Sequence, residues 1–297
     1  MAEAFLRGVR ILELGETRAV AFAGKLLADL GAEVWMLEAA GRGNRLRRRR
    51  PLLPSGVSGL FEFLARGKRS VTVDLGLEDG QELARRLAGC CNGVVAERSA
   101  WHRVEPDESA GTRPPPLSVV TVSSRGAPHL SEPESELVDV HEGGVGYMTP
   151  GRVTDPEREY PIDMAGGGQA SYIGGLSAAI ALFHGLALAR TTGETVRNDV
   201  SLQAAAASMM VLNVPWWEYA GIVPSRRAAG RPSRSVNGFV RVKDGRVSIS
   251  MIEEHQWDSL VRVLGAPEWT ALPAFATQID RSTNWDALVL CLEEHFK

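Results

Sequence analysis

Cysteine is scarce in this sequence, and the three that occur are Cys90, Cys91 and Cys291. Two of them are adjacent, an arrangement that rarely supports an ordinary disulfide, and no CxxC pair exists. The scarcity argues against a zinc knuckle and against a thioredoxin-type redox motif. The first eight residues contain neither a long apolar run nor a small-residue cleavage site, so no signal peptide is predicted. We therefore expect a cytoplasmic protein.

The chain also lacks an excess of charge of one sign. Its 33 Lys and Arg residues face 36 Asp and Glu residues, for a formal net charge of −3 over 297 residues. This balance argues against a strongly basic nucleic-acid binder and against an acidic tail. Because 44% of the residues are hydrophobic, the chain has enough apolar side chains to bury a core, which excludes a mostly disordered protein.

Several nucleotide-binding, metal-binding and hydrolytic motifs are missing. The turn after the first predicted strand reads GETRAV over residues 15–20, where a dinucleotide-binding fold requires GxGxxG. No GxxxxGK[ST], HExxH or GxSxG sequence occurs, and the six histidines are scattered without metal-ligand spacing. The sequence therefore predicts neither a nicotinamide or flavin site nor a metal site.

One long segment without charge resembles a membrane span. Residues 164–189 contain no Asp, Glu, Lys or Arg and exceed the length that a bilayer crossing needs. The segment nevertheless carries three successive glycines together with Gln, Ser, Tyr and His, which are costly to transfer into the hydrocarbon core. This composition is typical of a buried helix packed closely on a sheet, so we predict no membrane partner.

Strand and helix patterns alternate along the first part of the chain. Short runs rich in Val, Ile and Leu alternate with segments of helical pattern, which implies right-handed βαβ crossovers and a mainly parallel sheet. Near residue 225 an Arg-, Ala- and Pro-rich linker begins, and Asp244-Gly245 then marks a hairpin turn between two strand-like runs. The predicted fold is α/β, with a doubly wound, Rossmann-like large domain over residues 1–224 and a smaller α+β domain over residues 225–297. The expected strands are 9–14, 33–38, 70–75, 93–95, 117–122 and 195–201, and the expected helices include 19–30, 77–88, 254–264 and 285–296.

Two basic segments and one acidic residue are candidate functional features. The RLRRRR run at 45–50 is either a solvated loop or a lip that contacts phosphate, since guanidinium groups bind phosphate in bidentate fashion. Residues 66–70, RGKRS, form a second compact cationic turn. Asp163 stands directly before the glycines 166–168, which open the long uncharged segment. Glycines permit close approach of a ligand, and N–H groups at a helix start favour negative charge, so Asp163 is either a helix cap or a catalytic acid.

Six segments occur here in the order in which one enzyme family carries them. That family is class III CoA-transferase, of the CaiB/BaiF type, which also includes formyl-CoA transferase, carnitine CoA-transferase and the α-methylacyl-CoA racemases. The chain resembles it through ILELG at 11–15, FAGKLLADLGAEV at 22–34, RGKRSVTVDL at 66–75, IDM with its glycines at 162–168, TGE followed by DVSL between 192 and 202, and DG followed by QW between 244 and 257.

The resemblance implies an acyl-CoA transferase that moves CoA between carboxylic acids. In that family an aspartate matching Asp163 attacks the thioester of acyl-CoA, and an aspartyl-CoA thioester then delivers CoA to an acceptor carboxylate. The implied partners are acyl-CoA, a carboxylic acid and a second subunit interlocked with the first, with CoA as part of the substrate and no metal. The implied CoA and substrate contacts are Glu16, Arg18, Ala19, Lys68, Arg98, Gly166 and Gly167.

The chain departs from the family pattern at several positions. Met36 and Ala39 stand where relatives carry a Lys and often an Arg, so Arg98 or residues 47–50 are the expected replacements as CoA anchors. The adjacent His-Asp pair of the racemases is missing, although His141 remains a candidate base. The alternatives are therefore a CoA-thioester racemase or epimerase, and a non-catalytic or half-site subunit of a heteromeric complex.

The end of the chain carries one further expectation. Residues 275–297 correspond to an interior segment of the family, and relatives continue with a part that returns to the large domain. We expect this C-terminal return segment to be absent here or supplied by a separate chain.

Overall fold

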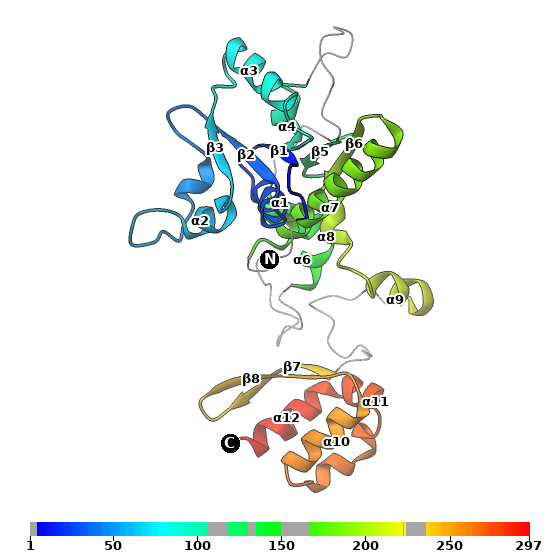
Figure 1. Cartoon of the computed structure of the whole chain (residues 1–297). Coiled ribbons are helices and arrows are strands. Elements are labelled where there is room, and N and C mark those ends of the chain that lie inside the picture. Colours follow the sequence, from blue (N-terminus) through cyan, green and yellow to red (C-terminus); the bar gives the residue numbers. More distant parts are fainter. Residues whose placement is uncertain (1–4, 106–117, 130–134, 150–166, 222, 224–235) are drawn as a thin grey trace. The chain divides into compact units, whose positions relative to one another are not determined.

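The structure is a computed structural model that describes residues 5–105, 118–129, 135–149, 167–221, 223 and 236–297 (Figure 1). The chain divides into two compact units. The larger comprises Met1–Tyr147 with Ile162–Ile222, and the smaller comprises Met148–Pro161 with Val223–Lys297. Each unit has a hydrophobic core of its own.

A six-stranded parallel sheet forms the centre of the larger unit. Its strand order is β3-β2-β1-β4-β5-β6, and all five neighbouring pairs are parallel. The chain order reverses between β1 and β4, and ligands bind outside the carboxyl ends of the strands at such a switch point. The predicted doubly wound, mainly parallel α/β fold is confirmed. The strands are β1 (Arg10–Leu14), β2 (Glu33–Glu38), β3 (Arg69–Thr72), β4 (Gly93–Glu97), β5 (Ser118–Ser123) and β6 (Val196–Ser201).

Helices cover both faces of this sheet. The helices predicted over residues 19–30 and 77–88 correspond to α1 and α3, whose observed bounds differ from the predicted ones by one residue at three of the four ends. The helices of the larger unit are α1 (Arg18–Asp29), the 3-10 helix η1 (Arg45–Arg48), α2 (Gly59–Ala65), α3 (Glu78–Ala88), α4 (Arg98–Trp101), α5 (Glu136–Glu142), α6 (Val145–Met148), α7 (Gln169–Thr192), α8 (Leu202–Ala207) and α9 (Asn213–Ala220).

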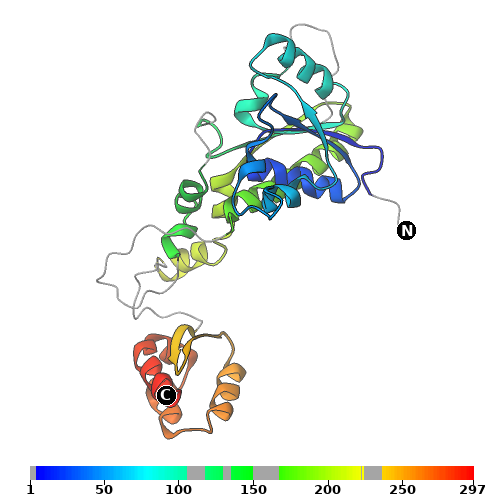
Figure 2. The same ribbon diagram turned by 90° about the vertical axis from the view of Figure 1, so that its left-hand side faces the viewer.

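Alternate side chains of each strand enter two different cores. In β1, Ile11 packs with residues of α1 and α7, whereas Leu12 and Leu14 pack with residues of α3 and α4. In Figure 2, α3 in cyan lies on one side of the sheet and α1 in blue on the other. Because strand side chains alternate with a period of two, a strand buried on both faces reads as one continuous apolar run.

Helix α7 packs against the sheet and against α1, and its glycines make this close approach possible. A Cβ built on Gly175 would lie 2.5 Å from the carbonyl oxygen of Ala19, and one built on Gly185 would lie 2.2 Å from Ser118 Oγ. Within the described part of the chain, α7 is the one helix long and apolar enough to cross a membrane by length and composition. Its contacts with α1, β4, β5 and β6 are those of a core helix.

The smaller unit consists of an antiparallel hairpin and a group of helices. The hairpin and the two helices predicted over residues 254–264 and 285–296 are all present. The core includes Val240, Trp257, Trp285 and Leu288, all buried. The elements are β7 (Val236–Val242), β8 (Gly245–Met251), α10 (Glu254–Val263), the 3-10 helices η3 (Glu268–Ala271) and η4 (Pro273–Phe275), α11 (Gln278–Thr283) and α12 (Trp285–His295).

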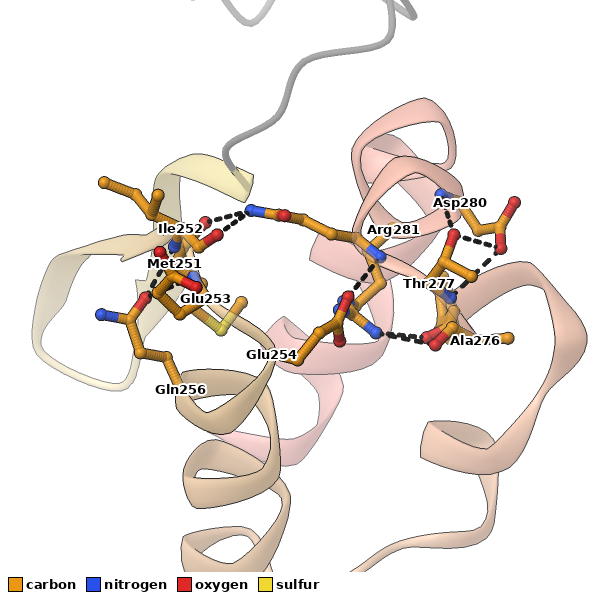
Figure 3. A network of polar contacts seen from close by, with 11 residues as sticks. Met251, Ile252, Glu253, Glu254, Gln256, Ala276, Thr277, Asp280 and Arg281 are labelled. Atoms are coloured by element: carbon orange, nitrogen blue, oxygen red, sulfur yellow. Dashed lines mark hydrogen bonds and ion pairs between the residues drawn. The ribbon is translucent and has the colours of Figure 1, made fainter.

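A polar network joins the end of β8 and the start of α10 to α11 (Figure 3). The buried Arg281 forms an ion pair with Glu254, and its guanidinium lies 4.8 Å from the ring centroid of Trp257. Gln278 Nε2 donates a hydrogen bond of 2.5 Å to the carbonyl oxygen of Ile252. These contacts hold the exit of the hairpin in place with side chains that lie more than 20 residues away in the sequence.

Candidate functional site

The turn after β1 is closed by a carboxylate from β4. Glu97 Oε1 accepts hydrogen bonds from the backbone N–H groups of Glu16 and Thr17, at 2.5 and 2.6 Å. Gly15 has φ +150°, and a Cβ built on it would lie 2.8 Å from Glu97 Cγ. In dinucleotide-binding folds the N–H groups at this helix start hold a phosphate. Here the protein's own carboxylate occupies two of them, which agrees with the missing GxGxxG sequence.

Glu38, at the end of β2, is surrounded by donors from the same chain. Arg47 binds it in bidentate fashion, with both N–O distances 2.6 Å, and Ser70 Oγ and the Asn44 N–H add bonds of 2.6 and 2.7 Å. The Arg47 guanidinium foremost, together with these hydrogen bonds, lowers the pKa of Glu38 to about 2. Arg47 also stacks 4.2 Å from the Phe61 ring. This arginine of the basic run therefore anchors its own loop.

A first cavity of about 460 Å³ opens where β1, β2 and β4 end. Two arginines bring positive charge to it, and one of them, Arg42, lies 2.8 Å from Glu16 Oε1. Its place at the switch point of the sheet is the usual location of a ligand crevice in such folds. The lining residues are Leu14, Gly15, Glu16, Leu37, Glu38, Ala39, Ala40, Arg42, Val73, Asp74, Leu75, Gly76, Glu97, Ser99, Ala100 and Arg103.

A second cavity, of about 560 Å³, is strongly cationic. It is bounded by the turn after β1, by η1, and by the starts of α5 and α7. Four arginines and two glutamates line it, and Glu16 belongs to both cavities. The lining residues are Glu16, Thr17, Arg18, Arg45, Leu46, Arg48, Arg49, Ser135, Glu136, Leu137 and Ser171.

The start of α7 is held by two charged side chains of the second cavity. The Glu136 carboxylate accepts hydrogen bonds from the N–H groups of Ala170 and Ser171, at 2.8 and 3.0 Å. Arg18 Nη1 donates to the carbonyl oxygen of Gly167 at 3.1 Å, and a Cβ built on Gly168 would lie 1.4 Å from the same nitrogen. The sequence interpretation treated the N–H groups at this helix start as free for a substrate. That expectation is wrong for residues 170 and 171, because Glu136 already binds them.

Lys68 lies in the interior, and its ammonium binds the protein itself. Its Nζ is 2.6 Å from Glu13 Oε2 and donates to the carbonyl oxygen of Ala21 at 2.7 Å, with both charged side chains fully buried. Burial raises the pKa of the Glu13 carboxyl, and the adjacent ammonium opposes the rise. Gly24 makes room for the pair, since a Cβ there would lie 1.7 Å from Glu13 Oε2. The side chain of Lys68 lines neither cavity, so this geometry favours a structural role.

The structure brings together only some of the site residues expected from the sequence. Glu16 and Arg18 line the second cavity, and Arg18 joins Gly167 to it by donating a hydrogen bond to the carbonyl oxygen of Gly167. Ala19, in the first turn of α1, is fully buried in the hydrophobic core. Arg98 lines a separate cavity of about 200 Å³ beside β5 and β6, with Nη2 3.9 Å from Glu105 Oε2. Asp163 and Gly166 lie outside the described residues.

Two further titratable groups lie in α5. The start of this helix lines the second cavity, but these two groups do not. Asp139 is fully buried and accepts a hydrogen bond from Ser124 Oγ, and burial raises its pKa to about 6. The ring of His141 packs on Gly146, where an added Cβ would lie 2.4 Å from His141 Cγ. A racemase requires two acid–base groups facing one substrate. Neither of these groups lines the two cavities.

The sequence interpretation missed the two carboxylates that cap helix starts around the cavities. Glu97 binds backbone groups 80 and 81 positions away, and Glu136 binds groups 34 and 35 positions away. The one local indication is that Glu97 ends a buried strand. Among the described residues, no group of three His, Cys, Asp or Glu side chains is arranged to hold a metal ion.

Comparison of sequences extends over nearly the whole chain. The sequence model of a family described as CoA-transferase family III matches residues 6–297. The chain is 31% identical to the probable fatty acyl-CoA transferase Rv3272 of Mycobacterium tuberculosis, in an alignment covering 97% of this chain and 76% of that protein. It is 27% identical to the succinyl-CoA–D-citramalate CoA-transferase of Chloroflexus aurantiacus, with 94% and 69% covered.

Comparison of structures leads to the same group of proteins. A crystal structure of a CAIB/BAIF family protein from Brucella suis superposes with a TM-score of 0.80 at 26% identity, covering 98% of this chain and 78% of that one. A crystal structure of Rv3272 from Mycobacterium tuberculosis superposes with a TM-score of 0.78 at 26% identity, covering 99% and 78%. Sequence and fold therefore agree along the whole described chain.

Proposed function

The chain belongs to CoA-transferase family III, and from this membership we propose that it moves CoA between carboxylic acids through an aspartyl-CoA thioester on Asp163. As a CoA-transferase, it acts on a CoA thioester and a carboxylic acid. The observation that carries the aspartyl step is the sequence Ile162-Asp163-Met164, which matches the position of the family's nucleophile.

In the sequence, Asp163 comes four residues before Gly167. The carbonyl oxygen of Gly167 is bound by Arg18, which lines the second cavity. This contact supports our proposal that the substrate of Asp163 binds at the second cavity.

The reaction then consists of carbonyl substitutions at three acyl carbons. The Asp163 carboxylate attacks the thioester carbonyl, the C–S bond breaks, and CoA leaves as a thiolate from a mixed anhydride. The thiolate attacks the aspartyl carbonyl of that anhydride and releases the donor acid, so that Asp163 carries CoA as a thioester. The acceptor carboxylate attacks the aspartyl carbonyl, CoA leaves again, and its thiolate attacks the acceptor carbonyl and frees Asp163. No electrons are exchanged, and every acid leaves as a carboxylate.

Arg18 is the residue to which we assign stabilisation of the developing oxyanions. A carboxylate is a weak nucleophile, so this chemistry needs alignment, exclusion of water and donors aimed at the oxyanion. Arg18 Nε is buried and has no hydrogen-bond partner among the described residues, while Nη1 of the same group binds Gly167. We propose that Glu16 and Gly167 complete the substrate contacts. Ala19 and Lys68, which are buried, then stabilise the turn after β1 from the protein interior.

Trapping of the intermediate tests this proposal. With an acyl-CoA donor and hydroxylamine, the aspartyl-CoA thioester is expected to convert Asp163 into a hydroxamate, located by mass spectrometry of the peptide that contains it. Turnover of acyl-CoA with no hydroxamate, or with one at another acid, would contradict the aspartyl step. Exchange of the α-proton of a 2-methylacyl-CoA in D₂O without CoA transfer would establish the racemase alternative instead.

We also propose that the active form is a homodimer. Leu176, Ile180 and Phe183 form an exposed apolar row on α7, at the spacing of one helix face, and Phe5 stacks on its end with 5.3 Å between ring centroids. Such a row favours a subunit contact. A native mass of about twice the 32.1 kDa of the chain is expected. A monomeric mass at micromolar concentration, or a mass that includes a different chain, would contradict the homodimer.

A further inference from the structure

We propose that the ion pair between Glu16 and Arg42 is exchangeable: a phosphate group of the ligand replaces the Glu16 carboxylate on Arg42 and releases the Glu16 side chain. The inference rests on the proposed function, because the ligand whose phosphate competes is the CoA that this function requires. It goes beyond that function, since it assigns to the chain an internal anion that competes with its own ligand.

Glu16 stands at the boundary between the two cavities. It lines both of them, whereas Arg42 lines only the first of the two. Arg42 Nη1 lies 2.8 and 3.0 Å from the two carboxylate oxygens of Glu16. Release of the Glu16 side chain therefore changes the walls of both cavities at once. The released carboxylate is then available for the substrate contact that we assign to Glu16 above.

The backbone around Glu16 is held in place, which leaves the movement to its side chain. Its N–H group is bound by Glu97, and its carbonyl oxygen accepts a hydrogen bond of 3.1 Å from Arg45 Nε. The carboxylate, by contrast, is bound by Arg42 alone among the described residues. Breaking that one contact frees the side chain without disturbing the turn after β1.

The pair of Arg47 and Glu38 shows what a permanent ion pair of this region looks like. Glu38 is 2% exposed, and both of its N–O distances to Arg47 are 2.6 Å. The side chains of Glu16 and Arg42 are instead 22% and 54% exposed. An exposed pair contributes little to stability, whereas breaking one side of a buried pair is costly. Of these two arginines, Arg42 is therefore the one that a ligand can take over.

The position of the first cavity favours a phosphate as the competing anion. The cavity lies at the switch point of the parallel sheet, where ligands bind in such folds, and Arg103 brings a second cation to it. A phosphate can bind two nitrogens of a guanidinium at once, whereas Glu16 binds Arg42 through Nη1 alone. The phosphate can therefore form the stronger pair. The carboxylate of a substrate acid carries the same kind of charge and is the other source of such an anion.

Three other carboxylates line the first cavity, but they do not compete for Arg42. Each accepts hydrogen bonds from other groups of the chain, namely from Arg47 or from backbone N–H groups. These carboxylates belong to Glu38, Asp74 and Glu97. Among the described residues, Glu16 is the one acid that pairs with Arg42. A phosphate that approaches Arg42 therefore has to displace a single carboxylate.

Calorimetric titration of the full chain with CoA and with ADP tests the exchange, because both ligands carry phosphates and neither carries a carboxylate. R42Q should weaken both about tenfold or more, since a charge-assisted contact is lost. E16Q should bind both about two- to fivefold more tightly, since an exposed ion pair that competes with the ligand contributes on that scale. In the double variant E16Q/R42Q, most of this gain should disappear, because the carboxylate acts through Arg42.

E82Q is the matched control for E16Q. Glu82 also pairs with an arginine, Arg85, at 2.9 Å, but it lies on α3 and lines neither cavity. This variant removes the same charge from the chain and should leave the affinity for both ligands unchanged.

Three results would overturn the inference. The first is an E16Q variant that binds CoA and ADP no more tightly than the unmodified chain does. The second is a gain of the same size in E82Q, or in E16Q with and without Arg42, which would reduce the effect to general charge. The third is a lower KM for the carboxylic acid acceptor in E16Q with no change for CoA or ADP, which would assign Arg42 to the acceptor. Because these titrations involve no transfer, a missing hydroxamate at Asp163 would instead overturn the aspartyl step alone.

Discussion

Replacing Asp163 with asparagine is expected to lower kcat for CoA transfer by about a thousandfold or more, as for other covalent nucleophiles. The amide has nearly the shape of the carboxylate but no anionic oxygen, so neither the mixed anhydride nor the aspartyl-CoA thioester can form. The affinity for CoA should change little, because the nucleophile acts on the thioester carbon. Initial rates with an acyl-CoA donor and a carboxylate acceptor, together with a binding titration, measure both quantities.

A matched control is available in Asp139, a buried acid of α5. Asp139→Asn also removes one carboxylate, but Asp139 lines neither cavity, and its raised pKa of about 6 means that its buried site tolerates a neutral group. We expect this variant to keep the rate of the unmodified chain within a few-fold. A rate for Asp163→Asn similar to that of Asp139→Asn would contradict the role of Asp163 as nucleophile.

The second large effect concerns stability and is expected for Lys68→Met. Removing the ammonium leaves the Glu13 carboxylate fully buried, and its Oε1 already lacks a hydrogen-bond partner among the described residues. Breaking one side of a buried ion pair costs about 3–5 kcal/mol of the free energy of unfolding. Urea titration of the larger unit's transition at pH 7 should show the loss. The double variant Glu13→Leu/Lys68→Met should recover most of it, since no charge then remains buried.

Arg69→Met is the matched control for Lys68→Met. Arg69 is the next cation along the chain, but its side chain is 74% exposed and pairs with Glu33 at the surface. Exposed pairs contribute little, so this variant should unfold nearly like the unmodified chain. Equal unfolding of Lys68→Met and Arg69→Met, together with a weaker affinity for CoA in Lys68→Met, would instead restore Lys68 as a CoA contact.

The fold could be predicted from the sequence because its main strands and helices follow patterns of neighbouring residues. The runs around residues 11–14 and 93–96, which are apolar except for Glu13, are buried on both faces of a parallel sheet. The glycines within residues 164–189 predicted a helix packed closely on a sheet, and α7 makes these contacts. The short helices η1, α2 and α5 were not predicted, since they carry too few residues for a periodic pattern.

Only part of the candidate site could be predicted from the sequence, because its side chains bind groups of elements that are distant in the sequence. The turn after β1 was predicted to border the site, but its carboxylate partner Glu97 comes from a strand 81 positions away. Likewise, the five arginines among residues 45–50 look alike in the sequence. Packing separates them, because Arg47 meets Glu38 while Arg48 and Arg49 face the cavity.

By itself, the sequence determined the parallel α/β architecture, the absence of a dinucleotide motif and membership of CoA-transferase family III, since period, turn residues and ordered motifs are properties of neighbouring positions. Only the tertiary structure decided what each charge does. It buried Lys68 against Glu13 and capped α7 with Glu136, and it placed Arg48 and Arg49 at the cavity wall, where neither has an ion-pair partner among the described residues. The reason is physical: the energy of a charge depends on burial and on which groups the fold brings within a few ångströms of it.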